Sequence, residues 1–250
     1  MHKFFVEQNN INDDIAIIYG EDVKHIYKVL RLKPSDEVLI NNSNGLEYLG
    51  EILEIDKTQV KVCLKEKYSI SNESNISVTL FQGIPKGSKL DYIVQKGVEV
   101  GINDFYLVET KRVIVKGEKD ESRKLERLNK ISKEAAKQSK RSIIPWVNSK
   151  ISFSDMLSKL KEYDVIIVPY ENKEEYGIKK LFLEKKDISI KKVAIIIGPE
   201  GGFEEEEINL LEQQKSSIVT LGPRILRTET AGVIAAAIVL YEIGDIGGKI

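Results

Sequence analysis

Two short, uninterrupted runs of apolar residues limit the possible folds of this chain more than any other feature. Val165–Val168 and Val193–Ile197 contain no polar residue, which is typical of strands buried on both faces in a parallel sheet. Helical patterns alternate with such strands, as in Lys89–Val100, which ends at Gly101, and in Thr228–Ile243. This alternation predicts an α/β fold with a parallel sheet and helices on both faces.

The N-terminal part of the chain follows a different pattern. Residues 1–67 contain several short strand-like runs and only one helical pattern. A polar segment rich in Ser and Asn follows at 69–77 and is typical of a linker. We therefore expect two domains, a small β domain at 1–70 and the α/β domain at 76–250.

The helix of the predicted β domain covers Glu21–Leu32 and has two distinct faces. Three apolar residues share the face that we expect to meet the core: Ile26, Val29 and Leu30. Three basic residues line another face at helical spacing: Lys24, Lys28 and Arg31. Such a basic face suits contacts with a nucleic-acid backbone, although a solvated helix face would give the same pattern.

Composition excludes several classes of protein. One Cys and two His rule out a disulfide framework and a Cys-cluster or multi-histidine metal site. The longest apolar run, Val233–Tyr241, is far shorter than the roughly 18 residues of a membrane span, so we expect a cytoplasmic protein without a membrane partner.

The charge is distributed unevenly along the chain. The net charge of −1 argues against a general nucleic-acid binder, but Lys111–Arg141 carries 12 basic and 5 acidic residues, a local excess of +7. Trp146 is expected to pack rather than to stack on a base.

The segment AIIIGPEGGF, residues 194–203, is the first candidate for a ligand site. A buried strand runs into Gly198–Gly202, and open α/β sheets bind ligands at such strand ends. The segment lacks the GxGxxG and GxxxxGK[ST] patterns, and the acidic run Glu204–Glu207 would repel a phosphate. The loop therefore favours a neutral or cationic ligand, with a plain strand-to-helix turn as the alternative.

A second candidate, LGPRILRTETA at residues 221–231, also follows a predicted strand. It carries Arg224 and Arg227 and leads into a helix that Thr228 is expected to cap, with Glu229 in the first turn. Two arginines beside a strand-end loop are suited to bind an anion, although solvated loop arginines would give the same pattern. The two candidates together are more informative than either one.

Together these segments resemble the RsmE family, the 16S rRNA uridine-N3 methyltransferases of the SPOUT superfamily. Besides GPEGGF and LGPRILRTETA, further segments along the whole chain resemble the family. These are HKFFV and VLRL near the N-terminus, QGIPKGSKLDYIVQKGVEVG at 82–101, EAAKQSKR at 134–141 and VPYE at 168–171. Lys140 stands where the family usually has Gly.

The resemblance implies a SPOUT-type α/β domain with a deep C-terminal trefoil knot, preceded by a small PUA-like β-barrel domain. A knot would not be expected from general rules of topology, because connections between strands and helices rarely thread through a loop. Family members bind S-adenosylmethionine in the knot and act as homodimers. The residues expected to bind the cofactor are Pro169, Tyr170, Glu171, Ile197, Gly198, Pro199, Glu200, Gly201, Gly202, Leu221, Gly222, Leu226, Arg227, Thr228, Glu229, Thr230 and Ala231.

The implied substrate is 16S rRNA in the 30S subunit, methylated at N3 of the decoding-region uridine conventionally numbered 1498. The residues expected to contact RNA are Lys24, Lys28, Arg31, Lys86, Lys89, Arg112, Arg141 and Arg224. N3 must lose its proton during the reaction, and no residue is an obvious base. We therefore expect Arg227, with Arg141 from the other subunit, to stabilise the developing uridine anion.

Three alternatives stay open at this point. The chain could be an RNA-binding module without catalysis, or a SPOUT methyltransferase for a different RNA site, including a ribose 2′-oxygen. A nucleotide-dependent enzyme such as a dehydrogenase is disfavoured, because the glycine fingerprint is missing. Measurements of cofactor binding and of methyl transfer would distinguish these possible functions.

Overall fold

The chain folds into two compact units in the computed structural model. The described residues are 1–42, 45–68, 72–113, 121–171 and 176–248. The first unit comprises Met1–Glu73 with Ala136–Ile144, and the second comprises Ser74–Ala135 with Pro145–Ile250. Residues 69–71 of the predicted linker fall outside the described residues. Residues 136–144, which we expected to belong to the α/β domain, are grouped with the N-terminal unit.

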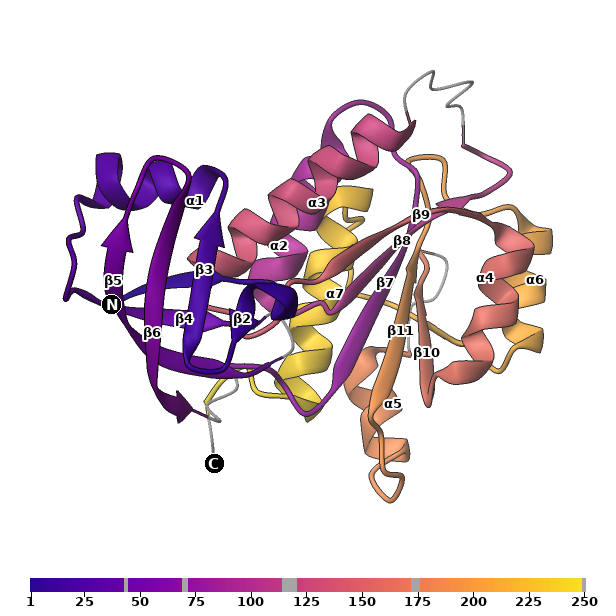
Figure 1. Cartoon of the computed structure of the whole chain (residues 1–250). Coiled ribbons are helices and arrows are strands. Elements are labelled where there is room, and N and C mark those ends of the chain that lie inside the picture. Colours follow the sequence, from indigo (N-terminus) through magenta and orange to yellow (C-terminus); the bar gives the residue numbers. More distant parts are fainter. Residues whose placement is uncertain (43–44, 69–71, 114–120, 172–175, 249–250) are drawn as a thin grey trace. The chain divides into compact units, whose positions relative to one another are not determined.

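The N-terminal unit is built on a curled six-stranded sheet with the order β1-β4-β5-β6-β3-β2, drawn in indigo and purple in Figure 1. Its strands are β1 (His2–Phe5), β2 (Ile11–Asn12), β3 (Ile15–Tyr19), β4 (Glu37–Asn41), β5 (Glu47–Ile55) and β6 (Gln59–Tyr68). β1 and β4 run parallel, and the other neighbours run antiparallel. Alternate residues of β3, Ala16 and Ile18, are buried in the core, as the period of two in a half-buried strand requires.

The helix of this unit differs from the predicted one. α1 (Glu21–Lys24) continues into a π-helical turn, η2 (His25–Leu30), which ends at Arg31. The turn keeps Ile26 in the core but leaves Val29 66% exposed. The predicted apolar face is therefore wrong at Val29, because the wider π-helical turn shifts the positions that share a face.

Residues 136–144 are fixed to the N-terminal unit by ion pairs that are buried or partly buried. The Arg141 side chain is 4% exposed, and its Nε lies 3.2 Å from Glu73 Oε2. Lys137 Nζ donates a hydrogen bond to Asp22 Oδ1 at 2.7 Å. Because a buried charge without its partner is costly, these pairs make the segment an integral part of this unit.

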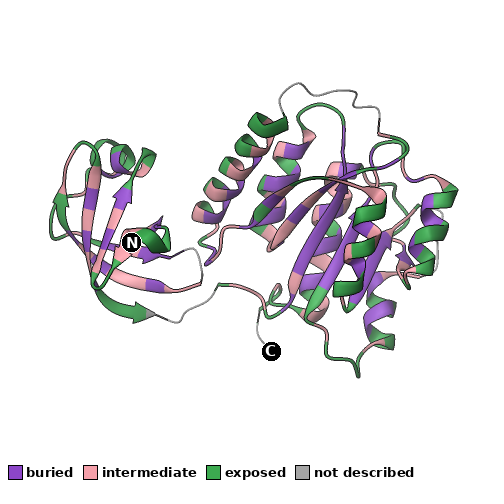
Figure 2. Ribbon diagram, turned by 45° about the vertical axis from the view of Figure 1, so that its right-hand side comes forward, coloured by how far each residue is buried: buried purple, intermediate pink, exposed green. Residues whose placement is uncertain are grey.

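The second unit contains a six-stranded sheet with the order β12-β10-β11-β7-β8-β9. Every neighbouring pair is parallel, which confirms the predicted α/β architecture. The strands are β7 (Ser77–Gly83), β8 (Asp104–Glu109), β9 (Trp146–Ser152), β10 (Val165–Pro169), β11 (Lys192–Ile197) and β12 (Ser217–Val219). The central strands are almost entirely buried, as their purple colour in Figure 2 shows.

Helices cover both faces of this sheet. The helices are α2 (Lys89–Val100), α3 (Glu121–Gln138), α4 (Phe153–Lys159), η3 (Leu160–Glu162), α5 (Ile178–Glu184), α6 (Glu205–Gln213) and α7 (Thr228–Ile243). Met156 of α4 and Leu211 of α6 share one core with the sheet. α7 packs on β7 and β11 and contacts α2 and α5. The trefoil knot stays a prediction. Among the described residues, no helix combines the length and apolar composition that a bilayer span requires.

Candidate active site

The predicted ligand loops follow three neighbouring strands of the parallel sheet. β10 pairs with β11 on one side and with β12 on the other. Because all three strands are parallel, their carboxyl ends lie at the same edge of the sheet. The segments that follow them, Pro169–Glu171, Gly198–Gly202 and Leu221–Arg227, therefore meet at the place where open α/β sheets bind ligands.

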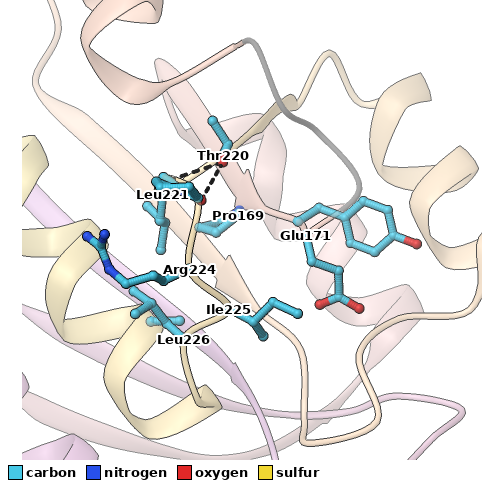
Figure 3. A pocket seen from close by; sticks show the side chains of 11 residues that line it. Pro169, Glu171, Thr220, Leu221, Arg224, Ile225 and Leu226 are labelled. Atoms are coloured by element: carbon cyan, nitrogen blue, oxygen red, sulfur yellow. Dashed lines mark hydrogen bonds between the residues drawn. The ribbon is translucent and has the colours of Figure 1, made fainter.

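Two adjoining cavities open at this edge, with volumes of about 440 and 360 Å³, which lie within the range of small-molecule sites. They share Pro169, Tyr170, Glu171, Ile225, Leu226 and Ala231. All residues predicted to bind the cofactor line one cavity or the other, except Gly201 and Thr230. The prediction omitted Thr220, Pro223, Ile225 and Phe203, which also line them. Figure 3 shows the Thr220 hydroxyl hydrogen-bonded to the Gly222 backbone, and Glu171 and Arg224 pointing away from each other.

A buried relay of hydrogen bonds holds the Gly198 loop to the start of α7. Thr228 Oγ1 donates to the Gly198 carbonyl at 2.6 Å and accepts from Gln82 Nε2 at 2.8 Å. Thr228 does not cap the helix as predicted. Arg227 occupies the N-cap position, because the Thr228 hydroxyl is engaged with Gly198. Gln82 was missed, although a polar residue at the end of the apolar strand β7 was a usable signal.

A second set of contacts joins the GPEGG loop to α2 and α7. Glu200 Oε1 accepts hydrogen bonds from Lys89 Nζ at 2.8 Å and from the Lys86 backbone N at 3.0 Å. Burial raises the pKa of Glu200, but the bonds from Lys89 and the backbone outweigh it and hold that pKa below its usual value. Lys89 Nζ also lies 3.6 Å from Glu229 Oε2. Lys89, which we expected to contact RNA, thus lies in the pocket lining between two carboxylates.

Arg112 fixes the other side of this loop. Its Nη1 donates to the Gly201 carbonyl at 2.6 Å, and its Nε donates to Glu204 Oε1 at 2.7 Å. The hydrogen bond from Arg112 lowers the pKa of Glu204. Glu204 and Glu207 form a capping box at the start of α6, so the acidic run satisfies the helix end as a capping box does. Arg112, expected to contact RNA, is bound within the protein.

The remaining predicted cations lie in different places. Arg227 lines the smaller cavity and Arg224 the larger one, and both side chains are exposed. Lys86 is exposed beside the GPEGG loop. The guanidinium of Arg141, which we expected to act from the other subunit, is buried against Glu73 in the N-terminal unit, and its role at the pocket stays a prediction. Within the described residues, no group of three or more His, Cys, Asp or Glu side chains could hold a metal ion.

The sequence matches the RNA methyltransferase domain family over residues 72–240 and the RNA methyltransferase PUA domain over 18–63. The first match covers more than half of the chain, and it includes all three loops of the pocket. The chain is therefore an RNA methyltransferase, and its curled N-terminal sheet is a PUA-like domain.

More specifically, the chain belongs to the ribosomal RNA small subunit methyltransferase E family. It is 35% identical to the Bacillus subtilis member over 97% of both chains. It is 31% identical to the member from Mesomycoplasma hyopneumoniae, over 93% of this chain and 96% of the other. The crystal structure of the Neisseria gonorrhoeae member, bound to S-adenosylmethionine, matches with a TM-score of 0.85 at 28% identity, over 98% of this chain and 99% of the other.

Proposed function

We propose that the protein transfers the methyl group of S-adenosylmethionine to N3 of a uridine in 16S rRNA. The acceptor is the decoding-region position conventionally numbered 1498, and the substrate is the 30S subunit in the cytoplasm. The observation that carries the proposal is the pocket at the ends of β10, β11 and β12, formed by the three loops that the family resemblance assigns to the cofactor. The names of the relatives that match the whole chain support a ribosomal substrate.

The chemistry of the pocket suits this cofactor. S-adenosylmethionine supplies a methyl group on a positively charged sulfonium and carries no phosphate. Three carboxylates line the pocket, those of Glu171, Glu200 and Glu229. Glu229 Oε2 is buried and forms an ion pair with Lys89 Nζ at 3.6 Å, but it accepts no hydrogen bond from a described residue, so a ligand N–H or O–H could supply one. Gly202 and Gly222 have φ values of 68° and 114°, which other residues rarely adopt.

The target base determines what the chain's own residues must do. N3 of uracil carries a proton that must leave while the methyl group arrives, so negative charge develops on the ring. Arg227 carries a guanidinium, which donates hydrogen bonds and accepts none, and it lies exposed at the pocket. We assign to it the stabilisation of this charge. Arg141, which we also expected to act from the other subunit, is paired with Glu73 of its own chain, so we assign this role to Arg227 alone.

We also propose that the protein is a homodimer, as the family resemblance implies. One face of α7 supports this. Ile234 and Tyr241 are exposed large apolar residues, and Ala237 and Ile238 lie between them at helical spacing. Burial of this face against a second copy would remove apolar surface from water. Light scattering should give the mass of a dimer, and a monomer at micromolar concentration would contradict this.

The function is tested by a methyl-transfer assay. Purified protein and S-adenosylmethionine are incubated with 30S subunits from a strain that lacks the modification, and the nucleosides of the digested rRNA are identified by mass. The expected product is 3-methyluridine at one position. A 2′-O-methylated nucleoside would show a different acceptor. Cofactor binding without transfer would indicate another RNA or an assembly intermediate, and loss of both would favour an RNA-binding module.

A further inference from the structure

The π-helical turn of the N-terminal unit presents an exposed surface that the proposed reaction does not use. We call it the η2 surface, and its residues are Lys24, His25, Tyr27, Lys28, Val29 and Arg31. Tyr27 is 38% exposed, although large aromatic side chains are usually more buried. Lys28 Nζ lies 5.7 Å from the centre of the Tyr27 ring. The surface therefore combines an accessible aromatic ring with several cationic groups.

This surface is held rigidly from below. Val23 and Ile26 are buried in the core of the N-terminal sheet. The Ile26 carbonyl accepts hydrogen bonds from the backbone N–H groups of both Arg31 and Leu32. Arg31 has a φ of 54°, the left-handed conformation that commonly ends a helix. The hydrogen bonds at Ile26 and the buried side chains below therefore fix the position of the exposed side chains of the turn.

Two acidic residues, Glu21 and Asp22, precede the basic residues of the surface on α1. Asp22 Oδ1 accepts its hydrogen bond from Lys137 Nζ at 2.7 Å. In the part of the chain that the structure describes, no ion pair joins Lys24, Lys28 or Arg31 to a carboxylate. Cationic groups around an aromatic ring are the combination that binds single-stranded nucleic acid, because bases stack on the ring while the cations contact phosphates.

We propose that the η2 surface binds an unpaired segment of the RNA substrate, with one base stacked on Tyr27 and the neighbouring phosphates contacted by Lys24, Lys28 and Arg31. The proposal rests on the proposed function, since it names how the N-terminal unit holds the RNA. An RNA duplex keeps its bases stacked internally, so it would meet only the cations and gain nothing from Tyr27. The aromatic ring thus selects single-stranded over double-stranded RNA.

The test compares Tyr27→Leu with Tyr27→Phe in the full-length protein. The probes are a single-stranded RNA of about 12 nucleotides, within the range of known single-strand site sizes, and a duplex of the same length, each titrated at several salt concentrations. Tyr27→Leu should weaken single-strand binding about tenfold at every salt concentration and leave duplex binding unchanged. Tyr27→Phe, which keeps the ring, should bind like the wild type. Lys28→Gln should weaken both and reduce the single-strand salt slope by about 0.7.

Several outcomes would overturn the proposal. Equal weakening of single-strand and duplex binding by Tyr27→Leu would mean that Tyr27 only shapes a duplex-binding face. If Tyr27→Leu does not weaken single-strand binding, or if Tyr27→Phe weakens it to the same extent, no base stacks on Tyr27. The circular dichroism spectrum and the melting temperature should be unchanged in all variants, which checks the folding of the N-terminal unit, and affinity for S-adenosylmethionine checks the second unit. Wild-type methyl transfer to 30S subunits is measured in parallel, so that failure of this proposal is separated from failure of the proposed function.

Discussion

The relay from Gln82 through Thr228 to Gly198 gives the most specific prediction for the cofactor pocket. Thr228→Val keeps the shape of the side chain and removes only its hydroxyl. The Gly198 carbonyl then loses the donor at 2.6 Å, and Gln82 Nε2 keeps only the Gly83 carbonyl at 3.0 Å. Because Thr228 is buried, an unsatisfied group there should lower the free energy of unfolding by about 1–3 kcal/mol.

Part of this loss should appear as weaker cofactor binding, since Gly198 belongs to the loop that lines the pocket. A loss of about 1.4 kcal/mol corresponds to a tenfold change in Kd, so we expect the Kd for S-adenosylmethionine to rise about tenfold. The melting temperature should fall by roughly 2–4 °C for each kcal/mol. Calorimetric titration of the full-length protein measures the first quantity, and differential scanning calorimetry measures the second.

Two further variants control this experiment. Thr228→Ser keeps the hydroxyl and should bind the cofactor almost as the wild type does. Gln82→Met removes the first donor of the relay, and its effect should not add to that of Thr228→Val, because residues of one network are coupled. If Thr228→Val lowers the melting temperature but binds the cofactor normally, the relay stabilises the fold only. If Thr228→Ser is as weak as Thr228→Val, the hydroxyl is not the cause.

Three other predictions concern charged groups. Arg227→Ala should lower kcat more than it weakens cofactor binding, as single-turnover kinetics and titration would show; equal, modest losses would indicate a binding role. Arg112→Ala removes the donor to Gly201 and should raise the cofactor Kd while thermal stability changes little, because the side chain is partly exposed. The pKa of Glu200 is lowered in the fold, so its pairing with Lys89 is present above the usual carboxyl pKa and is lost as the pH falls through the lowered value. Cofactor affinity should decline across that acidic range in the wild type but not in Glu200→Gln.

The sequence was most informative where one strong local pattern decides the structure. α2 and α7 begin and end at the predicted residues. Gly101, with a φ of 123°, ends α2. The buried strands β10 and β11 lie within one residue of their predicted ends. In these elements, the residues that determine burial or end the helix lie close together in the sequence.

The missed elements lack such a pattern. β9 (Trp146–Ser152) is an edge strand with mostly exposed or half-exposed residues, so it shows no apolar run. Its Trp146 is 57% exposed, and the expectation that it packs was wrong. α5 (Ile178–Glu184) is only seven residues long, too short for a clear helical period. The π-helical turn at His25–Leu30 was read as an α-helix because apolar spacing alone does not distinguish the two.

The cations show most clearly what a one-dimensional pattern leaves out. Lys89, Arg112 and Arg141 were all expected to contact RNA, yet each binds a carboxylate that lies 111, 92 and 68 positions away in the sequence, respectively. Distant acidic residues therefore neutralise part of a local charge excess such as that of Lys111–Arg141, while the RNA contacts of these residues stay a prediction. The loops that line the pocket are different, since each is one contiguous segment at the end of a strand. Parallel pairing alone brings such segments together, which is why their positions could be predicted while the partners of the cations could not.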